Sequence, residues 1–389
     1  MKAAPAQNRL QSLTGLRALA ALTVFGAHAV YTSGLLQDKK LLNSLGIAVA
    51  FACAAVSLFF VLSGFVLTWS AQPNDTAWGF WRRRYLRIFP NHLVIFALTM
   101  VFLARYGASG QSPMPGYDQS PHAGPAISQM FLVHVWIPRV DHFSAENVVT
   151  WSLACEAFFY LCFPVLLRLL RRIPADRLWA CAVGTILVGL AVPALAQFIK
   201  GPDALPMLPV SENAFWLSYV FPPSRLPEFF LGMLLARIVR EGRWIALRPR
   251  LTAWLPFVTI GVTPALPRTF MFGSIYATSC ALLVASIAAR DAGSAPSWLR
   301  TRVMVHLGER SFAFYVVHYF MIALALQFLI GNHSQFGVLG LAGIVCLVLL
   351  PLSAGAAYLL HRYVEAPLTR KFSRPRSRLR APSPDAVVG

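Results

Sequence analysis

The sequence predicts an all-α protein that crosses a membrane about ten times, with both termini in the cytoplasm. Of its 389 residues, 57% are hydrophobic and only 13% carry a charge, whereas a soluble domain is about half apolar and about a quarter charged. The hydrophobic residues also collect in long runs, and a run of about 20 residues can span a bilayer as a helix. This composition excludes a disordered chain, a collagen-like repeat and a disulfide-based scaffold.

Ten apolar segments are candidates for spanning helices, and together they define a transmembrane domain over residues 10–367. The seventh segment is the weakest, because it is short and contains Pro256, Pro264 and Pro267. The long connection at about 107–127 is rich in Gly, Pro, Ser and His, and residues 373–389 are predicted to form a basic, disordered tail. The candidate helices cover residues 12–33, 45–70, 90–106, 147–167, 178–199, 215–236, 252–267, 270–289, 311–330 and 336–361.

The basic residues support this topology and set its orientation. The formal net charge is +19, but the Lys and Arg residues lie in short clusters between the apolar runs, with no recognition helix or zinc spacing, which argues against nucleic-acid binding. With the N-terminus inside, 26 of the 34 Lys and Arg residues fall on the inner side and six on the outer side. Such an excess is what the positive-inside rule predicts for a cytoplasmic face.

The six cysteines lie in apolar stretches and form no Cys-x-x-Cys pair. This pattern favours small side chains packed between helices over disulfides or thiolate metal sites, so no metal is expected.

Ionisable residues inside a membrane usually face a cavity, because insertion of a charge costs about 2.5–3.5 kcal/mol. Arg17 and His28 lie eleven residues apart on the first helix, so they share a face to within ~20° and are separated by about 16 Å along its axis. Arginine suits an anionic group, and histidine is the usual general base near neutral pH. The pair therefore favours function, although each alone could be structural, Arg17 by reaching the interface and His28 by hydrogen bonding to a neighbouring helix.

Four further polar residues, Glu156, Arg225, Glu228 and His318, lie inside predicted spanning helices. Glu156 falls near mid-membrane and could orient His28, or form an ion pair with Arg17 or Arg225. Arg225 and Glu228 are three residues apart on one helix face, which favours a self-contained ion pair. His318 continues a polar stripe with Ser311 and Tyr315, and a structural role is slightly favoured for it.

Basic and small residues at the predicted inner face complete the candidate set. Arg82, Arg83, Arg84 and Arg87 could bind a ligand with several phosphates, but for Arg82 and Arg83 we favour a role in topology. Ser63-Gly64, inside an apolar run, would allow either close approach of another helix or a local break in its own helix.

In this order the motifs resemble the acyltransferase family 3 membrane proteins, which transfer acyl groups from acyl-CoA to hydroxyls. The resemblance covers almost the whole chain, from Leu13 to about Pro367, and its most specific element is the Arg17-x10-His28 spacing. A departure is Asn91-His92 after Pro90, where many members have an aromatic residue. The other shared motifs are Phe59-Phe60-Val61-Leu62-Ser63-Gly64-Phe65, Arg84-x-x-Arg87-Ile88-x-Pro90, Trp151-Ser152-Leu153-x-x-Glu156 with Phe159-Tyr160, Arg225 with Glu228-Phe229 and Gly232, Leu307-Gly308-Glu309-Arg310-Ser311 with Tyr315 and His318, and Glu365-x-Pro367.

The resemblance implies a multi-pass O-acyltransferase of the bacterial plasma membrane. It implies His28, Glu156 and Arg17 as catalytic residues, and Arg84, Arg87 and Arg17 as the residues that bind acyl-CoA, expected to be acetyl-CoA. The sequence is most similar to actinobacterial macrolide O-acyltransferases of antibiotic biosynthesis, so the acceptor hydroxyl is expected on a macrolide-type metabolite or on a glycan. The alternative is a transporter or flippase for a glycolipid or an antibiotic, which ten helices with intramembrane charges would also suit.

Overall fold

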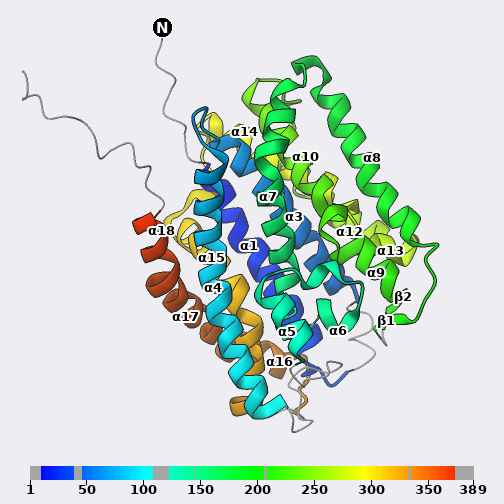
Figure 1. Cartoon of the computed structure of the whole chain (residues 1–389), viewed down its shortest axis with the longest axis vertical. Coiled ribbons are helices and arrows are strands. Elements are labelled where there is room, and N and C mark those ends of the chain that lie inside the picture. Colours follow the sequence, from blue (N-terminus) through cyan, green and yellow to red (C-terminus); the bar gives the residue numbers. More distant parts are fainter. Residues whose placement is uncertain are drawn as a thin grey trace, which may run out of the picture.

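The protein is a helical bundle whose long helices run roughly parallel (Figure 1). This computed structural model describes residues 10–38, 46–107, 122–144, 146–205, 208–331 and 334–372. Within these residues the β structure is limited to a short antiparallel pair, β1 (Asp203–Leu205) and β2 (Leu208–Ser211), and an isolated bridge between Leu36 and Phe336. The predicted all-α membrane fold is therefore confirmed.

The longer helices form the body of the bundle, and the shorter ones connect or cap them. The longer helices are α1 (Gln11–Ala27), α3 (Gly46–Ser70), α4 (Ala77–Tyr106), α7 (Thr150–Arg172), α8 (Leu178–Ala196), α10 (Pro222–Arg240), α14 (Ile275–Ala292), α15 (Arg302–Ala325) and α17 (Leu350–Leu360). The shorter ones are α5 (Ala123–Met130), α6 (Val140–Phe143), α9 (Glu212–Phe215), α11 (Pro249–Thr252), α12 (Leu255–Val262), α13 (Arg268–Phe272), α16 (Val338–Ile344) and α18 (Ala366–Phe372). Five π-helical turns extend or join them: η1 (His28–Thr32), η5 (Trp216–Val220), η8 (Leu326–Ile330), η9 (Val345–Leu349) and η10 (His361–Glu365).

Eight helical stretches among the described residues are long and apolar enough to cross a membrane. Two of the ten predicted segments differ from these. The predicted segment at 215–236 consists of η5 and α10. It is not among the eight stretches, and α10 carries the charged residues Arg225, Glu228 and Arg237. In the segment at 252–267 the longest helix is α12, whose eight residues rise only about 12 Å, too little for a hydrocarbon core of about 30 Å. The predicted tail at 373–389 and most of the connection at 107–127 lie outside the described residues, and the cytoplasmic location of both termini stays a prediction.

The centre of the bundle is built by α1, α3, α10, α14 and α15. Gly64 of α3 and Gly232 of α10 let these two helices touch backbone to backbone. A Cβ atom on Gly64 would lie 1.9 Å from the carbonyl oxygen of Phe229, and one on Gly232 would lie 2.1 Å from that of Val61. The close helix approach predicted at Ser63-Gly64 is thus confirmed, and only glycine fits there.

Helix α1 is anchored at its first turn, which fixes the positions of Arg17 and His28. The Asp291 carboxylate of α14 accepts hydrogen bonds from the backbone N–H and the hydroxyl of Ser12, at 2.7 and 2.6 Å. A carboxylate at a helix N-terminus also interacts favourably with the helix dipole. Next to it, Gly308 of α15 lies so close to α1 that a Cβ would be 1.9 Å from the carbonyl oxygen of Thr14.

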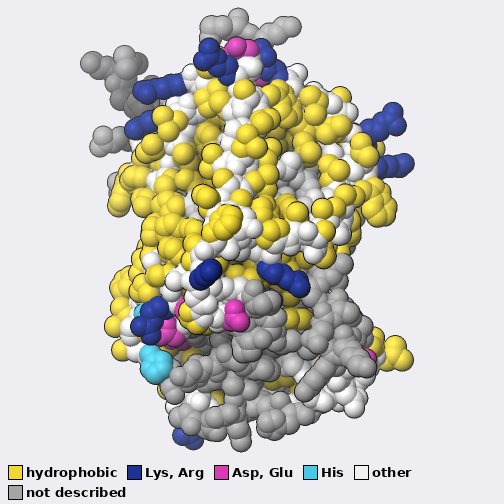
Figure 2. Space-filling view, turned by 90° about the vertical axis from the view of Figure 1, so that its right-hand side faces the viewer, with side chains coloured by type: hydrophobic (Ala, Val, Ile, Leu, Met, Phe, Trp, Pro, Cys, Tyr) yellow, Lys and Arg dark blue, Asp and Glu magenta, His cyan; other side chains and the backbone are white. Residues whose placement is uncertain are grey.

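The surface has the layered character of a membrane protein. Figure 2 shows a broad band of hydrophobic side chains, with Lys and Arg gathered at its upper end and again at a lower level. On α8 and the stretch containing α17, only 22% and 17% of the most apolar window is buried within the bundle. Large side chains there, such as Leu187 and Leu347, are 62% and 79% exposed. These two helices therefore present the face expected to contact lipid.

Candidate active site

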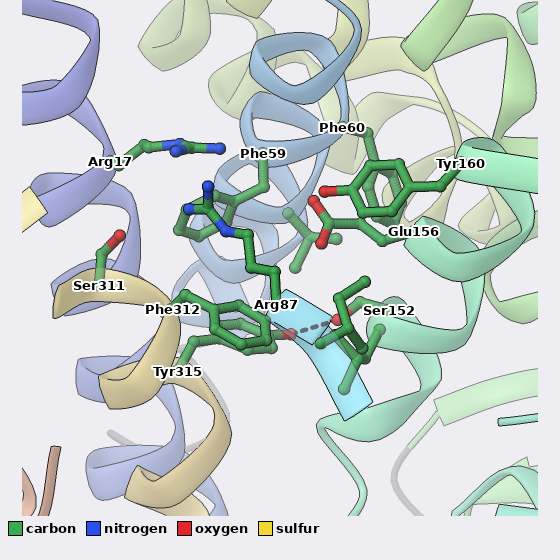
Figure 3. A pocket seen from close by; sticks show the side chains of 13 residues that line it. Arg17, Phe59, Phe60, Arg87, Ser152, Glu156, Tyr160, Ser311, Phe312 and Tyr315 are labelled. Carbon is green, nitrogen blue, oxygen red and sulfur yellow. Dashed lines mark hydrogen bonds between the residues drawn. The ribbon is translucent and has the colours of Figure 1, made fainter. Parts of the chain in front are cut away.

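Thirteen residues of α1, α3, α4, α7 and α15 enclose a cavity of about 610 Å³, counted to its open mouth, which we call the arginine cavity. Figure 3 shows the side chains of Arg17, Arg87 and Glu156 directed into it from three different helices. The lining residues are Arg17, Val56, Phe59, Phe60, Arg87, Ile88, Ser152, Leu153, Glu156, Tyr160, Ser311, Phe312 and Tyr315.

Two guanidinium groups share the arginine cavity with a single carboxylate. Glu156 interacts electrostatically with Arg17 and Arg87, and it is hydrogen-bonded by the side chains of Ser63 and Tyr160. The Ser63 hydroxyl also lies 3.3 Å from that of Tyr160. Because Arg17 and Arg87 together outweigh Glu156 by one positive charge, the cavity favours an anionic ligand.

Arg84 lies beside the arginine cavity without lining it. Its guanidinium carbon is 5.6 Å from the ring centre of Phe80 and 5.8 Å from that of Tyr160, a cation–π arrangement. Its Nε atom is buried and has no hydrogen-bond partner among the described residues. Arg83, by contrast, forms an ion pair with Asp75. Arg84 and Arg87 therefore differ in position, and Arg87 is the one that reaches the cavity.

A second cavity of about 960 Å³, also counted to its mouth, is lined by other residues of α1, α3 and α7 and by residues of η1, α6, α9, η5 and α13; we call it the histidine cavity. Among the described residues that line it, none is Asp, Glu, Lys or Arg and six are aromatic, which makes it a largely apolar space with His28 at its wall. The lining residues are Ala27, His28, Tyr31, Val49, Ala52, Cys53, Val140, Phe143, Ser144, Val148, Trp151, Phe215, Tyr219, Val220 and Phe272.

His28 stands where α1 changes from an α-helix to the π-helical turn η1. Such turns are frequent at functional sites. Its Nδ1 atom lies 2.9 Å from Nε2 of His318 on α15. The Nδ1 atom of His318 in turn lies 2.8 and 3.3 Å from the carbonyl oxygens of Tyr315 and Phe314. With Nδ1 of His28 engaged by His318, Nε2 is the ring nitrogen that remains for the histidine cavity.

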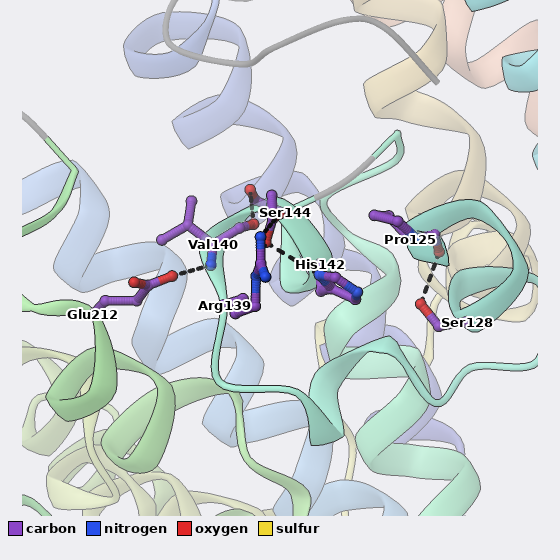
Figure 4. A network of polar contacts seen from close by, with 8 residues as sticks. Pro125, Ser128, Arg139, Val140, His142, Ser144 and Glu212 are labelled. Carbon is purple, nitrogen blue, oxygen red and sulfur yellow. Dashed lines mark hydrogen bonds and ion pairs between the residues drawn. The ribbon is translucent and has the colours of Figure 1, made fainter. Parts of the chain in front are cut away.

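The far end of the histidine cavity is covered by the segment around α6, whose polar contacts appear in Figure 4. Val140, which lines the cavity, donates its backbone N–H to the Glu212 carboxylate of α9. Arg139 donates two hydrogen bonds to Asp141, at 3.0 and 2.6 Å, and these hold the pKa of Asp141 at about 2. The segment is thus pinned by charged groups that point away from the apolar lining.

One polar bridge lies between the two cavities. The hydroxyls of Ser152 and Tyr315, both lining the arginine cavity, are 2.6 Å apart (Figure 3). Trp151, the residue before Ser152, lines the histidine cavity instead. The two cavities therefore back onto each other, and neighbouring residues of α7 belong to opposite sides of the wall.

The structure separates some of the predicted site residues and joins others. Arg17 and His28 come from one helix but line two cavities rather than the single groove expected from their spacing. Glu156 shares the arginine cavity with Arg17 and Arg87, whereas the ring partner of His28 is His318. The expected orientation of His28 by Glu156 is therefore not what the structure contains.

The predicted structural ion pair of Arg225 and Glu228 is confirmed. The two groups are 2.9 Å apart and fully buried. Arg225 also donates to the carbonyl oxygen of Phe272 at 2.6 Å and to the Ser57 hydroxyl at 3.1 Å. The unusual Asn91 and His92 make contacts of their own, Asn91 with Glu365 at 3.3 Å and His92 with the carbonyl oxygen of Gln129 at 3.0 Å.

Sequence reasoning missed the aromatic lining of the histidine cavity and underrated His318. Phe143, Phe215, Tyr219 and Phe272 come from segments far apart in the chain, and no local pattern marks them as neighbours. For His318 a signal existed, because it follows Ser311 and Tyr315 on one face of α15.

The chain is similar to known acyltransferases along most of its length. The "Acyltransferase domain" family model matches residues 10–359. The chain is 37% identical to Acyltransferase MdmB of Streptomyces mycarofaciens, over 97% of this chain and 96% of that protein. It is 24% identical to O-acetyltransferase OatA of Staphylococcus aureus, over 93% of this chain but only 57% of OatA. It is 25% identical to the putative peptidoglycan O-acetyltransferase YrhL of Bacillus subtilis, over 82% of this chain and 51% of that protein.

No solved structure matches the chain. The family match nevertheless decides between the two function classes that the sequence left open, in favour of an enzyme over a transporter. The chain belongs to acyltransferase family 3 and is a multi-pass membrane O-acyltransferase.

Proposed function

We propose that this enzyme transfers a short acyl group, acetyl in the simplest case, from acyl-CoA to a hydroxyl of a macrolide-type metabolite, at the bacterial plasma membrane. The observation that carries the proposal is the pair of back-to-back cavities, one lined by arginines and the other by aromatic residues and His28. A two-substrate transfer needs one site for an anionic donor and another for the acceptor, with the base beside the acceptor.

The arginine cavity is the proposed donor site. Arg17 and Arg87 would bind the phosphate groups of CoA, since guanidinium groups hold phosphates in charge-assisted pairs. Arg84 would support them from beside Tyr160. Glu156 would balance the two guanidinium groups before the donor enters, so its proposed role in catalysis is indirect.

The histidine cavity is the proposed acceptor site. Its apolar, aromatic lining supports a large uncharged acceptor. Aromatic side chains bind apolar rings well, but they offer few hydrogen-bond partners to the many hydroxyls of a glycan. This favours a macrolide-type molecule over a glycan, which is the competing acceptor in the test below.

In the proposed reaction His28 is the general base. Its Nε2 removes the proton from the acceptor hydroxyl as the oxygen attacks the thioester carbonyl. The carbon–sulfur bond then breaks, and the CoA thiolate takes the proton back from His28. The products are an ester and CoA with its thiol, and no metal enters any step. Such base catalysis contributes about 10²–10⁴-fold to the rate.

The test compares cells that produce the wild type or His28→Ala, by mass spectrometry of secreted metabolites and of envelope glycans. We expect one acyl increment to disappear from a small apolar product in the variant. Loss of the increment from a polysaccharide instead would move the acceptor to the glycan class. Normal acylation by His28→Ala would remove His28 from the mechanism.

A further inference from the structure

We infer that His318 is a positioning residue that fixes the ring of His28 in one tautomer, the one with the proton on Nδ1 and the lone pair of Nε2 facing the acceptor. The inference rests on the proposed role of His28 as general base. His318 itself is not among the residues that line the arginine cavity or the histidine cavity.

The protonation of His318 is set by its backbone partners. His318 is completely buried, and its Nδ1 faces the carbonyl oxygens of Tyr315 and Phe314. A carbonyl oxygen only accepts hydrogen bonds, so Nδ1 must carry the proton. A neutral ring then has a bare Nε2, which can only accept.

The accepting Nε2 of His318 also determines which nitrogen of His28 carries the proton. Because Nε2 of His318 accepts, the Nδ1 of His28 at 2.9 Å must be the donor. The ring centres are 5.2 Å apart and the planes differ by 25°. A hydrogen bond of 2.9 Å between the edges of two imidazole rings requires their centres to be about 5 Å apart, which is the separation found. The rings therefore meet edge to edge, and the lone pair on Nε2 of His318 is directed at the Nδ1–H of His28.

The surroundings hold both rings in place. The His318 ring packs against the rings of Phe25 and Phe314, with ring centres 6.1 and 6.0 Å away, and neither ring supplies a counter-charge. Tyr319 packs edge-on against His28 at 5.3 Å. The pair therefore works with two neutral rings, in contrast to the carboxylate that orients the histidine of a Ser-His-Asp triad.

The same geometry connects the pair to the wall between the cavities. Tyr315 holds His318 through its backbone carbonyl, while its hydroxyl bonds Ser152 at the arginine cavity. Its ring also packs on Phe59 at 5.8 Å. A single turn of α15 thus lies against the donor cavity and sets the tautomer of the base.

The test uses two variants of the full-length enzyme in lipid nanodiscs. His318→Leu removes the acceptor for His28, whereas His318→Gln can place an amide oxygen where Nε2 was. With acetyl-CoA and the unacylated form of the acceptor that the mass-spectrometric comparison identifies, we expect kcat to fall about 10- to 100-fold in the Leu variant, as for other residues that orient a functional group. KM for both substrates should stay within a few-fold, and Gln should recover a large part of kcat. His306→Leu, an exposed position on the same helix, is the matched control.

A spectroscopic readout makes the inference independent of activity. In protein labelled with ¹⁵N-histidine, the wild-type ring of His28 should show a protonated Nδ1 and a bare Nε2, and in His318→Leu it should shift toward the Nε2–H tautomer. A wild-type His28 with its proton on Nε2 would overturn the inference, as would Leu and Gln variants with equal kcat. If instead His28→Ala itself stays active, the proposed general base fails, whatever His318 does.

Discussion

The two cavities share α1, α3 and α7 but differ in almost every chemical respect. The arginine cavity holds two guanidinium groups and a carboxylate, while the histidine cavity has an imidazole among aromatic rings and no Asp, Glu, Lys or Arg among the described residues of its lining. In a membrane a charged lining is kept only where a ligand or a partner compensates it. The difference therefore separates a site suited to a charged donor from one suited to an uncharged acceptor.

The buried pair of Arg225 and Glu228 shows what an intramembrane arginine looks like without a ligand site. Arg225 is surrounded by Glu228, Phe272, Ser57 and the rings of Phe60 and Tyr219. Neither Arg225 nor Glu228 lines either of the two cavities. An arginine surrounded by protein groups in this way indicates a structural ion pair. Arg17 and Arg87, by contrast, face a cavity, which indicates that they bind a ligand.

The largest expected effect is on the histidine side. His28→Ala should lower kcat about 10²–10⁴-fold, because the proton of the acceptor hydroxyl loses its base. Binding of CoA, followed by calorimetry, should stay as in the wild type, since His28 lies outside the arginine cavity. The control is His306→Ala on α15, which should keep full activity. A parallel loss of CoA binding would mean that the two cavities are not separate sites.

On the arginine side we expect a change in affinity rather than in the chemical step. Arg17→Ala and Arg87→Ala should each raise KM for acetyl-CoA about 10- to 100-fold, because a hydrogen bond to a charged group contributes about 1.5–3 kcal/mol. Arg82→Ala, five residues before Arg87 on α4 and outside the cavity, is the matched control. Equal losses in Arg82→Ala would indicate a general effect of inner-face charge.

A smaller effect is expected at Glu156, and it distinguishes two roles for this carboxylate. Glu156→Gln removes the negative charge beside Arg17 and Arg87, so KM for acetyl-CoA should fall a few-fold while kcat changes little. Steady-state kinetics with each substrate varied in turn measures both. A collapse of kcat comparable to that of His28→Ala would instead return Glu156 to a direct role in the proton transfer.

The smallest effect on acyl transfer is expected for a substitution in the wall of the arginine cavity. Ser152→Ala removes the 2.6 Å bridge to Tyr315, a contribution of about 1 kcal/mol. We expect acyl transfer to fall a few-fold and hydrolysis of acetyl-CoA without acceptor to rise, because water reaches the donor more easily. Release of free CoA, measured with a thiol reagent, reports the leak. An unchanged leak would show that other residues seal the wall.

Much of this architecture follows from patterns within single helices. The apolar runs predict the helices, and Arg17 and His28 are conspicuous because ionisable residues are rare in such runs. Ser63-Gly64 predicts a close helix contact, which the structure confirms. Contacts between helices could not be predicted in this way. The partner of His28 is 290 residues away, and periodicity states which face of a helix is polar but not which helix it meets.

The two cavities illustrate the same limit. The eleven-residue spacing predicts Arg17 and His28 on one face, but their axial separation of about 16 Å is long enough for a wall to lie between them. Ser152 and Tyr315, from two other helices, line the arginine cavity on its side of that wall. A shared face was therefore mistaken for a shared groove.

The backbone contact of α3 with α10 has a consequence for how the protein is made. With Arg225 and Glu228 inside it, α10 is a poor substrate for the translocon by itself, since each charge within the helix opposes partition into lipid. Its main partner α3, with Ser57 and Gly64, is synthesised earlier and is already in place when α10 emerges from the ribosome. Insertion of α10 therefore depends on delayed, assisted entry against α3. A bulky residue at Gly64 would accordingly appear in cells as a topology defect and rapid proteolysis, before any loss of catalysis could be measured.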